Sequence, residues 1–80
     1  MKFELFTRVV LNADFPAHGL SKGDVATVVD EHPVAIGECG YSLEVFNAVG
    51  ETIAVLTVAE SQIKPLSSNQ VLHVRQLEAA

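Results

Sequence analysis

The feature that most restricts the fold of this chain is a series of five short segments rich in apolar residues. The segments are residues 3–11, 25–31, 41–46, 51–58 and 63–66, and glycine, proline, asparagine and serine separate them. Most of them alternate apolar and polar side chains, which is the pattern of a β-strand with one buried face. β-branched residues are frequent in them and favour strands. The sequence therefore predicts an all-β domain of five strands.

The first segment, Phe3 to Leu11, predicts a strand with two distinct faces. We expect the core face to consist of Phe3, Leu5, Thr7, Val9 and Leu11. The opposite face then consists of Glu4, Phe6, Arg8, Val10 and Asn12. A loop of roughly 12 residues follows, which is long by ordinary standards. Inside it, Phe15 and Leu20 are expected to fold back over the end of the domain.

The later segments carry turn signals at their ends. Residues 34–40 contain Gly37 and Gly40 and indicate a turn or a short edge strand. The loop Asn47–Gly50 predicts a four-residue hairpin in which Gly50 takes a positive φ. Residues 59–62 are short enough for one 3₁₀ turn. Pro65 restricts the last strand to a sheet edge, since proline donates no hydrogen bond to a neighbouring strand.

This arrangement is typical of a small five-stranded SH3-like barrel. We expect the barrel to occupy residues 1–66 and a C-terminal tail to occupy residues 67–80. The tail is ambiguous: apolar residues at positions 71, 74 and 77 have helical spacing, whereas Leu72 and Val74 on either side of His73 are strand-like. Helix, strand and disorder all stay open for it.

The chain has more apolar residues than a small core needs, because 49% of it is hydrophobic and short chains keep many residues at the surface. The segment 51–58 is apolar on both faces, which indicates a second covering layer. The candidate partner-binding residues are Phe6, Val10, Phe46, Ile53, Val55, Val71, Leu72 and Val74. Coverage by the chain's own tail, self-association as a homodimer and a protein partner are the alternatives.

Residues with chemical reactivity are scattered along the chain. His18, His32 and His73 have no second histidine or cysteine at the spacing of a zinc site. The single cysteine, Cys39, has no nearby base, and its acidic neighbour disfavours a thiolate. The carboxylates lack calcium-loop spacing, and Asp24 is expected to fix the turn after Gly23. We therefore expect no catalytic site, cofactor or metal.

The net charge of −5 disfavours nucleic acid as a partner, because phosphate binding depends on clustered Lys and Arg. Arg8, Lys22 and Lys2 form at most a small basic spot, which we interpret as ordinary surface charge. Acidity suits a basic protein partner. No apolar run of about 18 residues and no basic leader is present, so we expect a cytoplasmic protein without a membrane segment.

The run Gly19–Asp30 resembles the element Lys-Gly-Asp-x-Gly-Thr-Val-Val, which opens the second strand of many small barrels. Together with Tyr41–Asn47, Gly50–Val58 and Ile63–Leu66 it is similar to a family of short bacterial proteins catalogued as a domain of unknown function. The resemblance covers roughly residues 3–66, and Ala26 stands where the common pattern has glycine. The resemblance implies an SH3-like barrel. It also implies a gene that lies beside genes for other small proteins, an arrangement similar to that of toxin and antitoxin pairs.

Three hypotheses for the function follow. The first is a non-enzymatic protein-interaction module, antitoxin-like or immunity-like, which binds a partner through an apolar strand face. The second is a structural accessory or assembly domain of an enzyme complex. The third is a nucleic-acid-binding small barrel, which predicts an affinity that falls steeply with salt.

Overall fold

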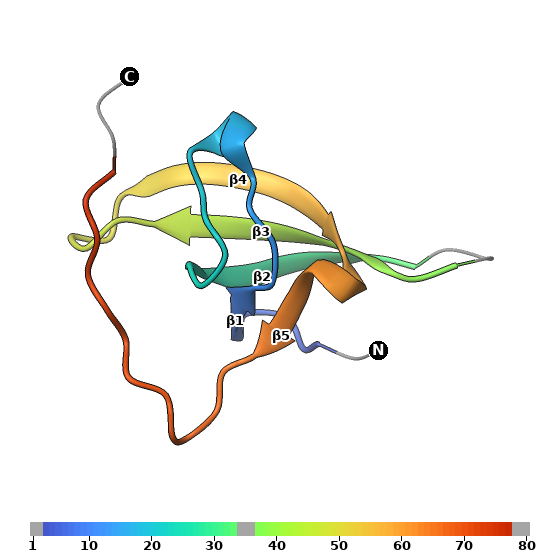
Figure 1. Ribbon diagram of the computed structural model, residues 1–80. Helices are drawn as coiled ribbons and strands as arrows, with labels where there is room; N and C mark the ends of the chain where they lie inside the picture. Colours follow the sequence, from blue (N-terminus) through green and yellow to red (C-terminus); the bar gives the residue numbers. More distant parts are fainter. Residues whose placement is uncertain (1–2, 34–36, 78–80) are drawn as a thin grey trace.

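Five strands and two 3₁₀ turns make up the regular structure of this protein (Figure 1). The computed structural model describes residues 3–33 and 37–77. The elements are β1 (Arg8–Leu11), η1 (Pro16–His18), β2 (Val25–His32), β3 (Gly40–Phe46), β4 (Thr52–Ala59), η2 (Glu60–Gln62) and β5 (Ile63–Pro65). None of the described residues lies in an α-helix, and the predicted all-β class is confirmed.

The strands form one antiparallel sheet in the order β4-β3-β2-β1-β5. β4 and β5 stand at opposite ends of that order, yet η2 alone joins them. Four flat inter-strand spacings measure about 19 Å, whereas the chain from Ala59 to Ile63 reaches at most about 14 Å. The sheet must therefore curl, and this strand order and curvature fit the predicted SH3-like barrel.

The core lies on the concave face of the sheet. Its largest fully buried side chains are Tyr41, Leu11, Leu43, Val9 and Val28. The ring of Phe3 packs edge-on against Tyr41, with 5.4 Å between the ring centroids. In the long loop, Leu20 is buried and Phe15 packs against the core, so both fold back over the domain as the sequence predicts. The structure adds that the backbones of these two residues pair.

The first strand is much shorter than the sequence pattern indicates, and the prediction for residues 3–7 was wrong. Phe6 adopts a φ of 64°, so the chain turns there and regular pairing with β2 begins only at Arg8. The Phe6 N–H donates to the Val28 carbonyl oxygen at 2.6 Å, and the Val28 N–H donates to the Thr7 carbonyl oxygen at 2.9 Å. The turn carries Phe3 back over the core and leaves Leu5 and Thr7, both expected inside, exposed.

Replacing Phe6 with glycine is expected to raise the free energy of unfolding by up to about 1 kcal/mol. A left-handed conformation costs a residue with a Cβ roughly 1–2 kcal/mol, and glycine avoids this cost. Glycine also loses more chain entropy on folding, which offsets roughly 0.5–1 kcal/mol of that gain. Little burial is lost, since the Phe6 side chain is 74% exposed. Urea unfolding measures the change, and Phe6→Ala, which keeps the Cβ, is the control. Equal stability of the two variants would show that no strain is stored at this residue.

The remaining connections agree with the sequence where they are described. The hairpin Asn47–Gly50 has a positive φ at Gly50, and the Asn47 side chain accepts the N–H groups of Val49 and Glu51. η2 occupies the predicted 3₁₀ position, and β5 is an edge strand that pairs only with β1. The expected turn at residues 34–40 lies partly outside the described residues.

Residues 66–77 cross the convex outer face of the sheet without regular secondary structure, and we call this segment the strap (Figure 1). Of the conformations left open for the tail, residues 67–77 therefore form neither a helix nor a strand. The sequence had left the conformation of this segment undecided.

Candidate functional site

The outer face of the sheet, opposite the core, carries the surplus apolar side chains of the chain. Val10 of β1 faces outward beside Val25 of β2, and Phe46 and Ile53 belong to the neighbouring strands β3 and β4. Val10 is only 6% exposed although it is not part of the core cluster. Its burial shows that part of this face is covered, and the strap lies over it.

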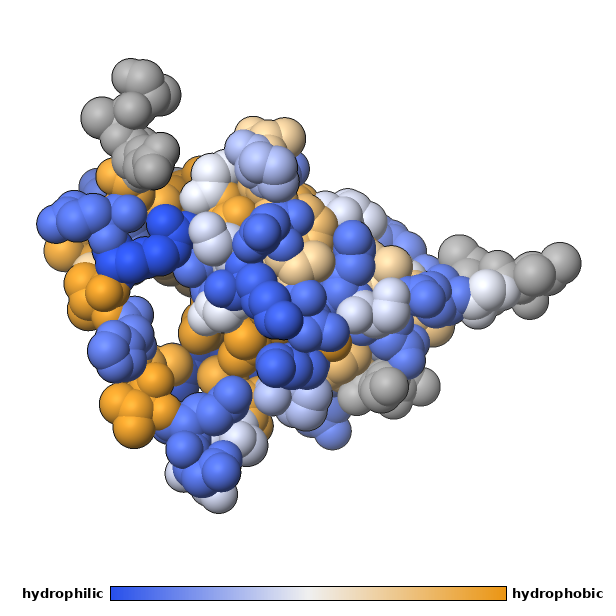
Figure 2. All heavy atoms as spheres, viewed as in Figure 1, coloured by the Kyte–Doolittle hydropathy of each residue, from blue (hydrophilic) through white to orange (hydrophobic). Residues whose placement is uncertain are grey.

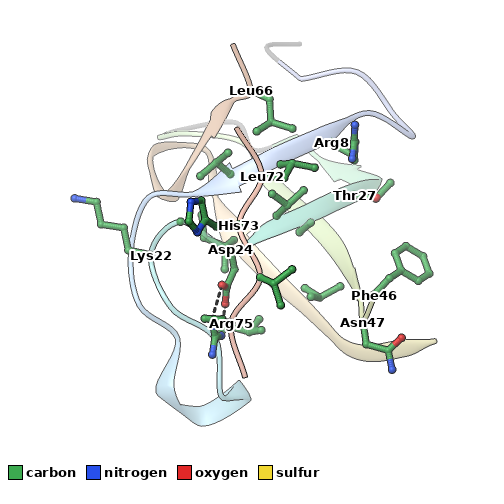
Figure 3. A pocket seen from close by; sticks show the side chains of 18 of the residues that line it. Arg8, Lys22, Asp24, Thr27, Phe46, Asn47, Leu66, Leu72, His73 and Arg75 are labelled. Carbon is green, nitrogen blue, oxygen red and sulfur yellow. Dashed lines mark hydrogen bonds and ion pairs between the residues drawn. The ribbon is translucent and has the colours of Figure 1, made fainter. Parts of the chain in front are cut away.

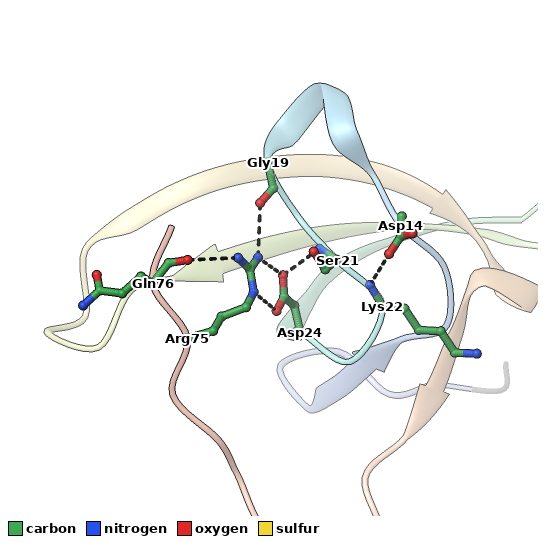
Figure 4. A network of polar contacts seen from close by, with 7 residues as sticks. All are labelled: Asp14, Gly19, Ser21, Lys22, Asp24, Arg75 and Gln76. Atoms are coloured by element: carbon green, nitrogen blue, oxygen red, sulfur yellow. Dashed lines mark hydrogen bonds and ion pairs between the residues drawn. The ribbon is translucent and has the colours of Figure 1, made fainter. Parts of the chain in front are cut away.

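A bidentate ion pair fastens the strap to the long loop (Figure 4). The Arg75 guanidinium donates to both carboxylate oxygens of Asp24, from Nε at 2.8 Å and from Nη2 at 2.5 Å. Nη2 also donates to the carbonyl oxygen of Gly19 at 3.1 Å. Such paired geometry is stronger than a single contact. Because Leu66 continues from β5, the strap is held covalently at one end and by Arg75 at the other.

Asp24 has two structural roles. Its Oδ2 accepts the Ser21 N–H at 2.8 Å, which fixes the turn as the sequence predicts. The pKa of Asp24 is lowered, chiefly by the hydrogen bonds from Arg75. Partial burial acts in the opposite direction and raises this pKa, whereas the hydrogen bond from the Ser21 N–H and the charge of Arg75 lower it further. Sequence reasoning missed the pairing with Arg75, because the two residues are 51 positions apart.

Between the strap and the outer face runs a groove with a volume of about 780 Å³ (Figure 3). In Figure 2 it is visible as an opening between the strap and the body of the molecule. Val10, Val25 and Ile53 line it from the sheet, and Leu66 and Leu72 line it from the strap. The groove thus has an apolar floor on the sheet, and the strap forms its other wall.

The structure brings six of the eight predicted partner-binding residues to this groove. They are Val10, Phe46, Ile53, Val71, Leu72 and Val74. Val55 lies on the outer face beside the groove and is 60% exposed, and Phe6 projects from the turn before β1. The strap does not bury its own apolar side chains, since Val74 is 90% exposed. Coverage by the tail is therefore partial.

The groove also gathers basic side chains. Its lining includes every Lys and Arg residue of the described part of the chain, namely Arg8, Lys22, Lys64 and Arg75. Among the described residues, Asp24 is its only acidic lining residue. Arg8 and Lys22, interpreted from the sequence as ordinary surface charge, lie on opposite sides of the groove (Figure 3), and Lys2 lies outside the described residues. Lys64 and Arg75 were missed, since only the fold brings them near.

The other candidate residues are dispersed. Among residues 3–33 and 37–77, no three His, Cys, Asp or Glu side chains converge as a metal site. His32 shares a hydrogen bond with Ser42, with 2.6 Å between Nε2 and Oγ. Cys39 is a free thiol that packs partly buried against the core. No helix within the described part of the chain is long and apolar enough to cross a membrane.

Comparison with known proteins gives one finding. A family model described as a domain of unknown function, DUF4926, matches residues 5–65. No curated protein and no solved structure matches the chain. The matched region begins just before β1 and ends with the last residue of β5, so the whole strap lies beyond it.

Proposed function

The chain belongs to the DUF4926 family of unknown function, and we propose that it is a non-enzymatic protein-interaction module that binds a protein partner across its outer face. The observation that carries the proposal is the row of solvent-exposed apolar side chains on β3 and β4, which comprises Phe46, Ile53 and Val55. Clustered apolar residues on a small acidic domain favour aggregation unless a partner covers them.

The specific form of the proposal is an antitoxin-like or immunity-like protein that covers the active surface of its partner. It works in a reducing cytoplasm, which the single thiol of Cys39 suits. Co-expression with the product of the adjacent gene tests this form. A stable complex together with relief of toxicity supports it, and neither a complex nor relief contradicts it.

The general proposal is tested by affinity capture with matched variants. Tagged wild-type protein is expected to retain one stoichiometric protein at high salt, because apolar contacts are not screened. The triple variant Phe46→Ser/Ile53→Ser/Val55→Ser is expected to lose at least about nine-tenths of that protein, as central apolar anchors carry most of the binding energy. Val49→Ser is the control, since Val49 is an exposed apolar residue of the hairpin that does not line the groove.

Two results would contradict the proposal. One is equal capture by the triple variant and by the wild type, which would place the contact elsewhere. The other is a protein that elutes alone at every salt concentration and is monomeric by light scattering.

A further inference from the structure

We propose that the groove between the strap and the outer face binds an extended acidic segment of a polypeptide, whose apolar side chains lie on the sheet. This inference rests on the proposed function and names the chemistry of the partner. It revises the expectation of a basic partner, which was based on the net charge of the whole chain.

The first step of the argument is the separation of charge. The chain has five Lys and Arg against ten Asp and Glu. All four basic residues of the described part of the chain line the groove, but only one of its nine acidic residues does. That acidic residue, Asp24, is already paired with Arg75. The groove is therefore a basic site on an acidic molecule, and opposite potential attracts acidic groups to it.

The second step is the shape and polarity of the lining. Val10, Val25 and Ile53 form an apolar floor, and Lys64 stands among the lining residues as an exposed cation, whereas the Lys22 side chain points away from the groove (Figure 3). A cleft of this volume lies within the range of sites that enclose ligands. An occupant that satisfies both parts of the lining carries apolar groups on one side and anionic groups on the other, as an extended chain with alternating residues does.

The third step is the backbone of the strap. In the described part of the chain, the peptide groups of residues 71–74 make no hydrogen bond to another backbone group. These residues are exposed, so their peptide groups are accessible to an incoming chain. A segment that enters the groove in extended form is able to pair with them, in the manner of an added β-strand. The strap thus offers main-chain contacts in addition to the charged and apolar ones.

Nucleic acid is the other polyanion to consider. The described lining of the groove contains one phenyl ring, Phe46, and one imidazole, His73, whereas single strands bind to successive stacking rings. Eight carboxylates of the described residues lie outside the groove, and they repel a polyanion that extends beyond it. The observations therefore favour a peptide.

Fluorescence anisotropy with synthetic probes tests the proposal on the full chain. The probes are a capped, labelled peptide of about ten residues alternating leucine and glutamate, the same peptide with lysine for glutamate, and an oligothymidylate of equal length. We expect the glutamate peptide to bind at least roughly tenfold more tightly than either other probe at low salt.

Matched variants locate the binding site. Arg8→Gln/Lys64→Gln removes two groove cations and is expected to weaken the glutamate peptide roughly tenfold. Ala17→Glu/Thr57→Glu changes the net charge equally at exposed positions outside the groove and is expected to change affinity by less than about twofold. Lys64→Gln alone provides a second groove variant, and thermal unfolding confirms that each variant is folded.

The proposal is overturned if the lysine peptide or the oligonucleotide binds as tightly as the glutamate peptide, or if both double variants weaken binding equally. Failure here is distinguishable from failure of the proposed function. Capture that still depends on Phe46, Ile53 and Val55, without affinity for the glutamate peptide, would retain the interaction module and reject an acidic partner.

Discussion

Leu43→Ala is expected to leave the protein largely unfolded in dilute urea. Leu43 has no exposed surface, and in the centre of the sheet it stands opposite Val28 on one side and Leu56 on the other. Truncating a buried leucine costs about 2–5 kcal/mol. An 80-residue domain has roughly 4–12 kcal/mol of total stability. One substitution thus removes a large part of it.

Intrinsic fluorescence is the measurement for this prediction. Tyr41 is the only tyrosine, the chain has no tryptophan, and the Tyr41 side chain is fully buried, so its emission reports the core directly. Val55→Ala is the control, because Val55 is largely exposed and its truncation should change stability by less than about 0.5 kcal/mol. Similar urea midpoints for the two variants would refute the assignment of the core.

Arg75→Gln is expected to release the strap at neutral pH while the sheet stays folded. The variant loses the two charged hydrogen bonds to Asp24 and the one to Gly19. Val10, which is 6% exposed, should then become several-fold more accessible, because Val10 and the strap line the same groove. Relaxation of the Val10 methyl groups by a soluble paramagnetic probe measures this accessibility.

The wild type should show the same release in acid. The pKa of Asp24 is lowered in the folded protein, mainly by the hydrogen bonds from Arg75. A carboxylate with a lowered pKa stabilises the fold above its unfolded value of about 3.9, and that contribution is lost as the pH falls through the folded value. The strap is therefore expected to stay fastened at neutral pH and to detach in acid below about pH 4.

Two controls distinguish protonation of Asp24 in its ion pair with Arg75 from general effects of acid on the protein. In Arg75→Gln the accessibility of Val10 should be high already at neutral pH and should not rise further in acid. Arg8→Gln, which removes a groove cation that makes no ion pair among the described residues, should behave as the wild type does. Full protection of Val10 in Arg75→Gln would show that the ion pair does not hold the strap.

The sequence predicted β2, β3, β4 and their hairpin closely, because each depends on local alternation and on turn residues such as Asn47 and Gly50. It failed at Phe6, where alternation continues through the turn and no glycine marks the positive φ. Pairing with β2 and closure of Phe3 over Tyr41 determine the backbone there, and both contacts lie far along the chain.

The candidate site was predictable in its apolar part only. The excess of apolar residues on segment 51–58 pointed to the outer face, and most of the named residues do meet at the groove. Its charge was not predictable, because Arg8, Lys22, Lys64 and Arg75 come from four separate segments. Net charge averages over the surface, so an acidic total concealed a local basic site.

The strap has a further consequence for how a partner enters. Joined to β5 at one end and to Asp24 at the other, it forms with the sheet a closed ring around the groove. A segment with a free terminus can pass through such a ring end-first, whereas an internal loop must wait for the ion pair to open. Added salt weakens that pair. Salt should therefore speed the entry of loops relative to that of termini, even as it weakens the attraction between the charges.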